Sequence, residues 1–524
     1  MNLINHSNAG DSASLLQRRR LMAGAGALGL AAAFGPGAAM AQSTPKKGGT
    51  LRMGLQGGSV SDTLDPRLIT DAVEIVTSLM LCNQLVEIDD KGNPTGELFE
   101  SWEVKPGAME WTFNVRRGIT FSSGKTLDAD DVIYSLNLHR GESKSGAKAV
   151  LADIAEIKKL STNQVSMRLN KGNVDLPFAF SDYHIVVVPN GFTNWTKLEG
   201  TGAFALEEFQ PGVRVTVVRK PGNYWKSGRG NFDRVEVRYI QDAAARTQAL
   251  MTGQVDIINK VDPRTAGLLG RNSALRLSRT PGMGNRFAFV AQTSRDPYAN
   301  ADLMLALKHG IDRNKIVQNV FAGYAVPGND HTVGPRQRFY AAQQKQTSFD
   351  PDKAKFHYQR AKVSGPLELQ VSEGAFPGAT DSAMLFQESL GRSGIPLDVK
   401  RVSGDGYWSN VWLKAPFCAV KWATRATVDI QMTLTFKAGG AWNDTQFNNA
   451  EFERLLVDAR VELDQGKRAQ MYARCQELIS QNSGMVCFAV EDYLDAHHTK
   501  LQGLTPSARL DMGDGRIAEK GWFA

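Results

Sequence analysis

Residues 111–121 read WTFNVRRGITF, and residues 128–136 read DADDVIYSL. In the first stretch, apolar residues from Trp111 to Val115 alternate with polar ones, which is typical of a half-buried β-strand. The side chain of Asp128 is suited to cap the start of a helix, and the apolar residues that follow recur at helical spacing. The two stretches predict a strand followed by an amphipathic helix.

The same alternation of strand and helix patterns continues on both sides of these stretches. Further strands are expected at 51–55, 213–217 and 235–239, and further helices after Asp312 and over 452–459. The chain has no internal repeat and no long low-complexity tract. These patterns predict an α/β fold.

Length and composition narrow the class of protein. The chain has 524 residues, 42% of them hydrophobic and 22% charged, which is ordinary for a globular protein and long enough for two or three lobes. The formal net charge is +7, but the sequence has no block of Lys and Arg and no basic stripe interleaved with aromatics. Nucleic acid is therefore not an expected partner, whereas a mild positive excess helps to attract an anionic solute.

The first 41 residues are typical of an export signal. Arg18-Arg19 resembles the arginine pair of the twin-arginine motif, and a stretch rich in Ala and Gly follows from Ala23 to Ala39. Its Gly and Pro residues make it a poor membrane anchor. Small residues at Ala39 and Ala41 favour cleavage before Gln42, and no Cys follows to carry a lipid. We expect a twin-arginine signal peptide over 1–41 and a mature protein free in the periplasm.

The four cysteines are too few and too scattered for a disulfide scaffold or a zinc cluster. Cys475 lies on the apolar face of a predicted helix and is expected in the core. Cys418 and Cys487 lie in strand-like runs, so they either pair across a sheet or remain buried free thiols.

Sequence motifs for catalysis are absent. There is no GxxxxGK[ST] loop, no GxGxxG between a strand and a helix, and no HExxH, CxxC or GxSxG. His497-His498 is the single adjacent pair of histidines, and neighbours on a strand point to opposite faces. We therefore predict no catalytic residues, no metal ligands and no cofactor, and we expect a binding protein rather than an enzyme.

A series of short segments resembles the peptide/nickel class of solute-binding proteins of ABC importers, family 5, over most of residues 48–505. Each segment is weak alone, but together they occur in the family's order and at suitable spacing. They are TLDP at 63–66, ESW at 100–102, WTFNVRRGITF at 111–121, GTGAF at 200–204 and ALMTGQVDI at 249–257.

The resemblance implies a type II periplasmic binding-protein fold with two lobes, a hinge and a subdomain inserted into lobe I. Lobe I is expected to comprise residues 48–82, 195–285 and 490–524, the inserted subdomain 83–194, and lobe II 286–489. The lobes would close on a solute, and the closed state would be recognised by ABC permease and ATPase subunits in the inner membrane. We expect a monomer. Docking to a chemoreceptor instead of an importer remains open.

Four tryptophans within 35 positions, Trp408, Trp412, Trp422 and Trp442, are either lobe II core or the wall of a ligand pocket. In the family's peptide binders, a G-W-x-x-D element supplies an aspartate for the peptide ammonium. When Trp422 is aligned with that tryptophan, Arg425 occupies the place of the aspartate. A guanidinium there would repel an ammonium and bind a carboxylate, phosphate or sulfonate.

Three more residues are ligand candidates. Asp429 either recovers a contact with an ammonium or pairs with Arg425. Gly58 and Ser59 either present backbone N–H groups and a hydroxyl to the cleft or form a flexible loop. The predicted solute is a short peptide, an opine-like amino-acid conjugate or a related acid.

Two alternatives remain beside this interpretation. A protein of the same fold could bind haem or a metal complex, although no cluster of His or Cys favours it. An exported hydrolase or redox enzyme is the alternative from another class.

Overall fold

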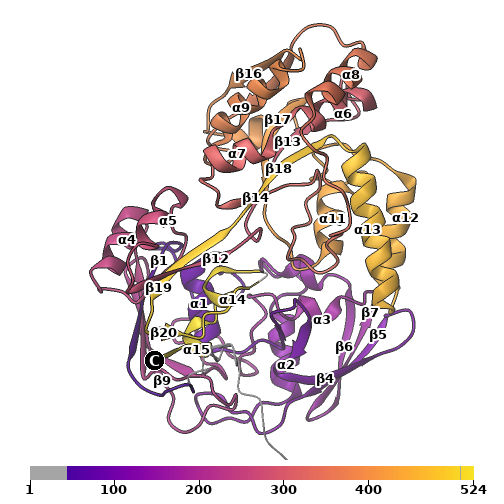
Figure 1. Cartoon of the computed structure of the whole chain (residues 1–524). Helices are drawn as coiled ribbons and strands as arrows, with labels where there is room; N and C mark the ends of the chain where they lie inside the picture. Colours follow the sequence, from indigo (N-terminus) through magenta and orange to yellow (C-terminus); the bar gives the residue numbers. More distant parts are fainter. Residues whose placement is uncertain (1–43, 508) are drawn as a thin grey trace, which may run out of the picture. The chain divides into compact units, whose positions relative to one another are not determined.

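The computed structural model describes residues 44–507 and 509–524. The predicted signal peptide, residues 1–41, lies outside the described residues. Across the described ranges, no helix combines the length and the apolar character that a membrane span requires. Residues 45–524 form one unit, and its elements are labelled in Figure 1.

A seven-stranded sheet has the order β12-β19-β11-β1-β10-β9-β8. Strand β1 is parallel to β10 and β11, and the other pairs are antiparallel. Three helices contact this sheet: α1 (Ala72–Leu81), α4 (Ala243–Met251) and α5 (Pro263–Leu269). The strands are β1 (Thr50–Leu55), β8 (Phe204–Gln210), β9 (Arg214–Arg219), β10 (Arg234–Tyr239), β11 (Ile257–Ile258), β12 (Leu275–Thr280) and β19 (Tyr493–His498).

A four-stranded antiparallel sheet has the order β4-β5-β7-β6 and contains the alternating residues 111–115. Helix α2 (Ala129–Asn137) follows strand β5 in the chain. The Asp128 carboxylate accepts hydrogen bonds from the backbone N–H groups of Asp130 and Asp131, so the predicted helix cap is confirmed. The strands are β4 (Phe99–Val104), β5 (Glu110–Val115), β6 (Ile154–Ser161) and β7 (Gln164–Leu169); β2 (Val86–Ile88), β3 (Pro94–Gly96) and α3 (Leu176–Ala179) lie in the same stretch of chain.

A six-stranded sheet has the order β14-β18-β13-β17-β15-β16. Its strands are β13 (Arg286–Ala291), β14 (Ala325–Pro327), β15 (Leu367–Val371), β16 (Leu397–Arg401), β17 (Phe417–Trp422) and β18 (Met485–Glu491). The helices of this region are α6 (Ala301–Gly310), α7 (Arg313–Asn319), α8 (Pro351–Ala361), α9 (Ala379–Gly391), α10 (Tyr407–Asn410), α11 (Val428–Phe436), α12 (Ala450–Val461) and α13 (Gln465–Asn482). Apolar side chains of this sheet and its helices form one large core.

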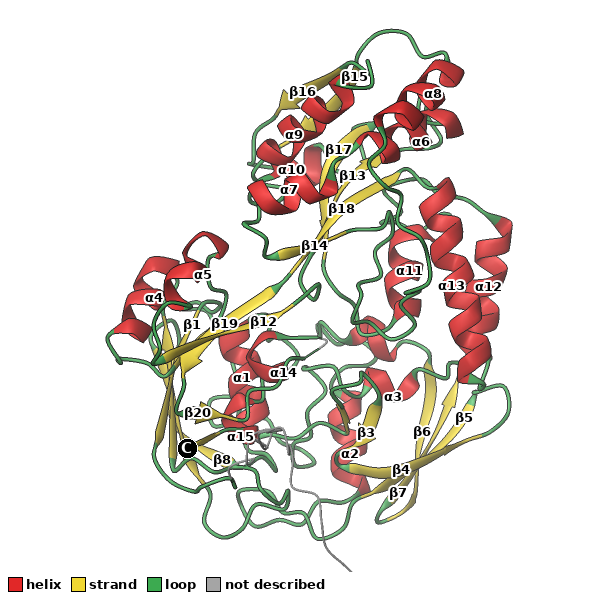
Figure 2. Ribbon diagram, in the orientation of Figure 1, coloured by secondary structure: helices red, strands yellow, loops and turns green. Residues whose placement is uncertain are grey.

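The chain passes twice between the seven-stranded and six-stranded sheets, from β12 into β13 and from β18 into β19 (Figure 2). Hydrogen bonds to two acidic side chains, the buried Asp492 and the half-buried Glu491, join the two crossing segments. The Asp492 carboxylate accepts a hydrogen bond from the N–H of Gly282 at 2.8 Å, and the Glu491 carboxylate accepts one from the Asn285 side chain at 2.7 Å. These two segments are the connections between the two sheets.

The C-terminal segment returns to the N-terminal part of the unit. It contains β20 (Leu501–Gln502), α14 (Asp511–Asp514), α15 (Ile517–Lys520) and β21 (Trp522–Phe523). Arg516 of this segment is fully buried and binds Glu97 through both of its terminal nitrogens, at 3.0 and 2.8 Å.

Two local predictions need correction. All four cysteines are free, and β17 and β18, which carry Cys418 and Cys487, lie on opposite sides of β13, so the disulfide alternative is wrong. The strand expected from residue 213 begins at Arg214, and Val213 is 57% exposed in the turn before it. Cys475 is buried on α13 as predicted.

Candidate functional site

The four tryptophans form one cluster. The ring centroids of Trp412, Trp422 and Trp442 lie 6.1 to 6.2 Å from one another, and Trp408 lies 5.7 Å from Trp412. Trp422, at the end of β17, is only 4% exposed, whereas Trp408 and Trp442 are 37% and 43% exposed. Trp422 therefore packs in the core, whereas the rings of Trp408 and Trp442 are partly exposed; their role as the wall of a ligand pocket stays a prediction.

A buried carboxylate, which the sequence argument did not predict, organises this cluster. The indole N–H groups of Trp412 and Trp422 both donate to Oδ2 of Asp444, at 3.1 and 3.0 Å. Oδ1 of Asp444 is buried and has no hydrogen-bond partner among the described residues. Burial raises the pKa of Asp444 to about 7, and the two indole donors lower it only in part.

Arg425 is held by its backbone while its guanidinium stays unpaired. Its N–H donates to Gln431 at 3.0 Å, and its carbonyl accepts a hydrogen bond from the Gln337 side chain at 3.2 Å. The guanidinium carbon lies 5.8 Å from the centroid of the Trp442 ring. Within the described part of the chain, the guanidinium has no carboxylate partner, and its Nε is buried without an acceptor.

The electrostatic environment of Arg425 reflects this arrangement. Burial lowers the pKa of Arg425, and the nearby Tyr183 raises it. Burial of a cation without a counter-charge is costly, and Arg425 is partly buried in this way.

Asp429 does not pair with Arg425, so that alternative is wrong. Thr427 caps α11, and the first turn of this helix directs the Asp429 side chain towards α12. There, Nε and Nη2 of Arg460 donate to the Asp429 carboxylate at 3.1 Å. Burial raises the pKa of Asp429 to about 6, although Arg460 opposes the shift.

Gly58 and Ser59 belong to a turn whose hydrogen bonds are internal to the protein. The Ser59 N–H donates to Asp62 at 2.7 Å, and the Gly58 carbonyl accepts from the Gln241 side chain at 2.7 Å. Gly58 has a φ of +140°, and a Cβ there would lie 2.5 Å from the Tyr239 ring. These contacts fix the conformation of the turn, and the Ser59 N–H is used in the hydrogen bond to Asp62.

Arg425 lines a small pocket together with segments that are far apart in the chain. The other lining groups come from the loop 336–339, the segment 426–428 at the start of α11, Arg509, Asp175 and Phe178 around α3, and Ile88 and Gly92. The space between them is about 30 Å³, which is room for about one water molecule. Four of the lining side chains are arginines. Only Arg425 among them was predicted, because the others come from segments without a distinctive pattern.

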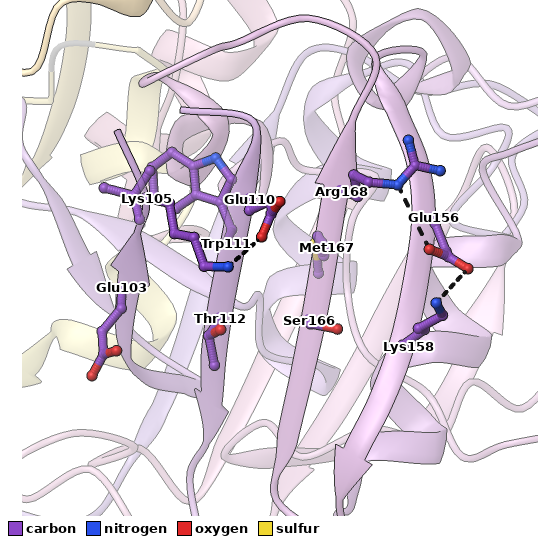
Figure 3. A pocket seen from close by; sticks show the side chains of 11 residues that line it. Glu103, Lys105, Glu110, Trp111, Thr112, Glu156, Lys158, Ser166, Met167 and Arg168 are labelled. Atoms are coloured by element: carbon purple, nitrogen blue, oxygen red, sulfur yellow. Dashed lines mark hydrogen bonds and ion pairs between the residues drawn. The ribbon is translucent and has the colours of Figure 1, made fainter. Parts of the chain in front are cut away.

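A larger pocket of about 440 Å³ lies on the outer face of the four-stranded sheet (Figure 3). Most of its charged side chains form ion pairs with one another on this face. Lys105 binds Glu110 at 2.5 Å, and Glu156 binds Lys158 at 3.0 Å. This surface is a solvated sheet face with paired charges, so Arg425 remains the better candidate for a site.

No group of three or more His, Cys, Asp or Glu side chains is placed to hold a metal ion in residues 44–507 and 509–524.

Comparison with known proteins decides the family. The family described as bacterial extracellular solute-binding proteins, family 5 Middle, matches residues 93–444, more than half of the chain. The chain belongs to this family.

The individual relatives have low sequence identity to this chain. The glutathione-binding protein GsiB of Salmonella choleraesuis is 24% identical over 491 residues, covering 88% of this chain and 93% of its own. The protein of the same name from Shigella flexneri is 24% identical over 473 residues, covering 85% and 90%.

Solved structures show the same fold. HbpA2 from Haemophilus parasuis has a TM-score of 0.80 at 20% identity, covering 91% of this chain and all of its own. AgaA from A. tumefaciens R10, in complex with agropinic acid, has a TM-score of 0.71 at 23% identity, covering 91% and 99%. The predicted fold class, the type II periplasmic binding-protein fold, is thereby confirmed. The chain is a solute-binding protein of the class that serves ABC importers, and the expectation of a binding protein rather than an enzyme is confirmed.

Proposed function

We propose that this protein captures a short peptide-like or anionic amino-acid-derived solute, with Arg425 as the anchor for an anionic group, and presents it to an ABC permease. The observation that carries the proposal is the unpaired, partly buried guanidinium of Arg425 beside Trp442. An anion would satisfy this guanidinium with a charge-assisted, two-point hydrogen bond. The exposed ring of Trp442 supplies adjacent apolar surface for the remainder of the solute.

The relatives support an acidic solute. GsiB is named for glutathione, and AgaA was solved with agropinic acid; both compounds contain carboxylic acid groups. DppA from Helicobacter pylori, with a TM-score of 0.71 at 19% identity, was solved with the peptide STSA.

The proposal includes movement. The space beside Arg425 holds about one water molecule, so a solute requires the lining segments to separate and close again around it. In the proposed division, lobe I comprises 48–82, 195–285 and 490–524, the subdomain 83–194, and lobe II 286–489. The crossings at Gly282 and Asp492 would then be the hinge.

The finer cellular assignment is also part of the proposal. Residues 1–41 direct twin-arginine export and are cleaved near Ala41, and the mature monomer works in the periplasm without a lipid anchor. It delivers its solute to permease and ATPase subunits of the inner membrane.

Thermal unfolding with glutathione, agropinic acid and the peptide STSA tests the function. A solute at about 100 times its dissociation constant adds about 2.7 kcal/mol to the free energy of unfolding. Arg425→Gln should weaken binding by about 2–5 kcal/mol, whereas Arg264→Gln, at an exposed ion pair with Asp262, should not. Equal stabilisation of the wild type and Arg425→Gln by the same solute would contradict the proposal.

A further inference from the structure

Arg338, which lines the pocket beside Arg425, is a second partly buried arginine without a carboxylate partner among the described residues. We propose that Arg338 binds a second anionic group of the same solute, so that the preferred solutes carry two carboxylates. This inference rests on the proposed function, and it adds a substrate class and a residue that determines specificity.

Arg338 is placed by aromatic rings. Its guanidinium carbon lies 4.6 Å from the centroid of the Phe339 ring and 5.7 Å from that of the Phe178 ring. Among the described residues, it makes one hydrogen bond, from Nη2 to the Gln465 side chain at 2.7 Å, which uses one of its five N–H groups. Rings that contact the guanidinium fix its position, while the remaining N–H groups stay available to an oxygen ligand.

The acids near this pocket are engaged by other arginines. Asp175 is bound by Arg468 at 2.7 Å, and both side chains are buried. Asp429 is bound by Arg460. Neither carboxylate forms an ion pair with Arg338 or Arg425.

Of the other two arginines of the pocket, Arg336 is exposed, and the partly buried Arg509 is neutralised within the protein. Arg509 donates to the Asp514 carboxylate at 2.5 Å and to the Ser181 carbonyl and hydroxyl at 2.7 Å. Arg338 and Arg425 are thus the two partly buried lining cations that lack a carboxylate among the described residues.

Arg338 and Arg425 both line this small space, and neither is compensated by an ion pair among the described residues. Burial lowers the pKa of Arg338, and Arg468 lowers it further against the opposing effect of Asp175. One monoanion would compensate only one of the two guanidinium groups. A solute with two separated carboxylates compensates both, and it binds more tightly than the same solute with one carboxylate turned into an amide.

The test compares matched solutes by calorimetry: glutathione with its glycine amide, and the dipeptide Ala-Glu with Ala-Gln. We expect the wild type to prefer the diacid of at least one pair by about tenfold or more. Arg338→Gln should reduce this ratio to about twofold or less, mainly through weaker binding of the diacid. Arg338→Lys, which keeps the charge, should restore part of the ratio, and Arg454→Gln, at an exposed position of α12, should leave it intact.

The outcomes separate the two proposals. Loss of binding in Arg425→Gln, with an unchanged diacid preference in Arg338→Gln, overturns the second anion site and leaves the function standing. Insensitivity of binding to both substitutions overturns both proposals. A wild type that binds both members of each pair equally, or neither, also overturns the diacid class. Unfolding curves of the unliganded variants verify that each is folded.

Discussion

Nη2 of Arg468 lies 2.7 Å from Oδ2 of Asp175, although the two residues are 293 positions apart in the chain. The pair joins α13 to the residue that precedes α3, at the border of the arginine-lined pocket. Both side chains are almost completely buried, so neither charge can be satisfied by water once its partner is removed.

Arg468→Met is therefore expected to lower the free energy of unfolding by about 3–5 kcal/mol, because it leaves the Asp175 carboxylate buried and uncompensated. Denaturant unfolding measures the change. The double variant Arg468→Met/Asp175→Leu removes both charges and should recover most of the loss. A double variant as unstable as the single one would show that the ion pair is not the cause.

Asp444 predicts a dependence of stability on pH. Its pKa is about 7 in the folded protein, whereas the ordinary value is 3.8. Between these values the unfolded chain releases a proton that the folded protein retains, so the contribution of Asp444 to stability falls as pH rises from about 4 to about 7.

Asp444→Asn keeps an acceptor for the two indole groups and removes the titration. As pH rises from about 4 to about 7, the free energy of unfolding of the wild type should fall relative to that of the variant. Above pH about 7, the difference between the two should stay constant. Chemical unfolding at a series of pH values measures the difference. A difference that does not vary with pH would contradict the assignment.

Glu519 predicts the opposite dependence. Burial raises its pKa, but the charges of Lys226, Arg516 and Arg229 outweigh this effect and hold the pKa at about 2. The resulting stabilisation is complete above the ordinary pKa of 4.5 and is lost as pH falls towards 2.

Glu519→Gln should lower the free energy of unfolding by about 3–5 kcal/mol at neutral pH, because it leaves buried cations short of a partner. The difference from wild type should shrink as pH falls from about 4.5 towards 2. A constant difference across that range would contradict the role of the Glu519 charge.

Helices and strands could be predicted from the sequence where the pattern depends only on residues close together in the chain. The alternation at 111–115 and the cap at Asp128 both depend on neighbours within a few residues, and the structure confirms them. Arg425 could be singled out because it stands three residues after Trp422 in a family element.

Partners that come from other elements could not be predicted. Arg460 reaches Asp429 because α11 and α12 pack together, and Asp444 reaches two indoles that lie 32 and 22 positions earlier. Local spacing does not encode which side chain meets a buried carboxylate. Arg338 likewise joins the pocket through a loop without regular structure.

The most direct test of the central claim is a crystal structure of the protein with the acid that stabilises it most in thermal unfolding. The account predicts a carboxylate of that solute bound by the Arg425 guanidinium, with N–H···O distances of about 2.7–2.9 Å. A solute whose acidic groups lie away from Arg425, with the guanidinium turned to a carboxylate of the protein, would contradict it.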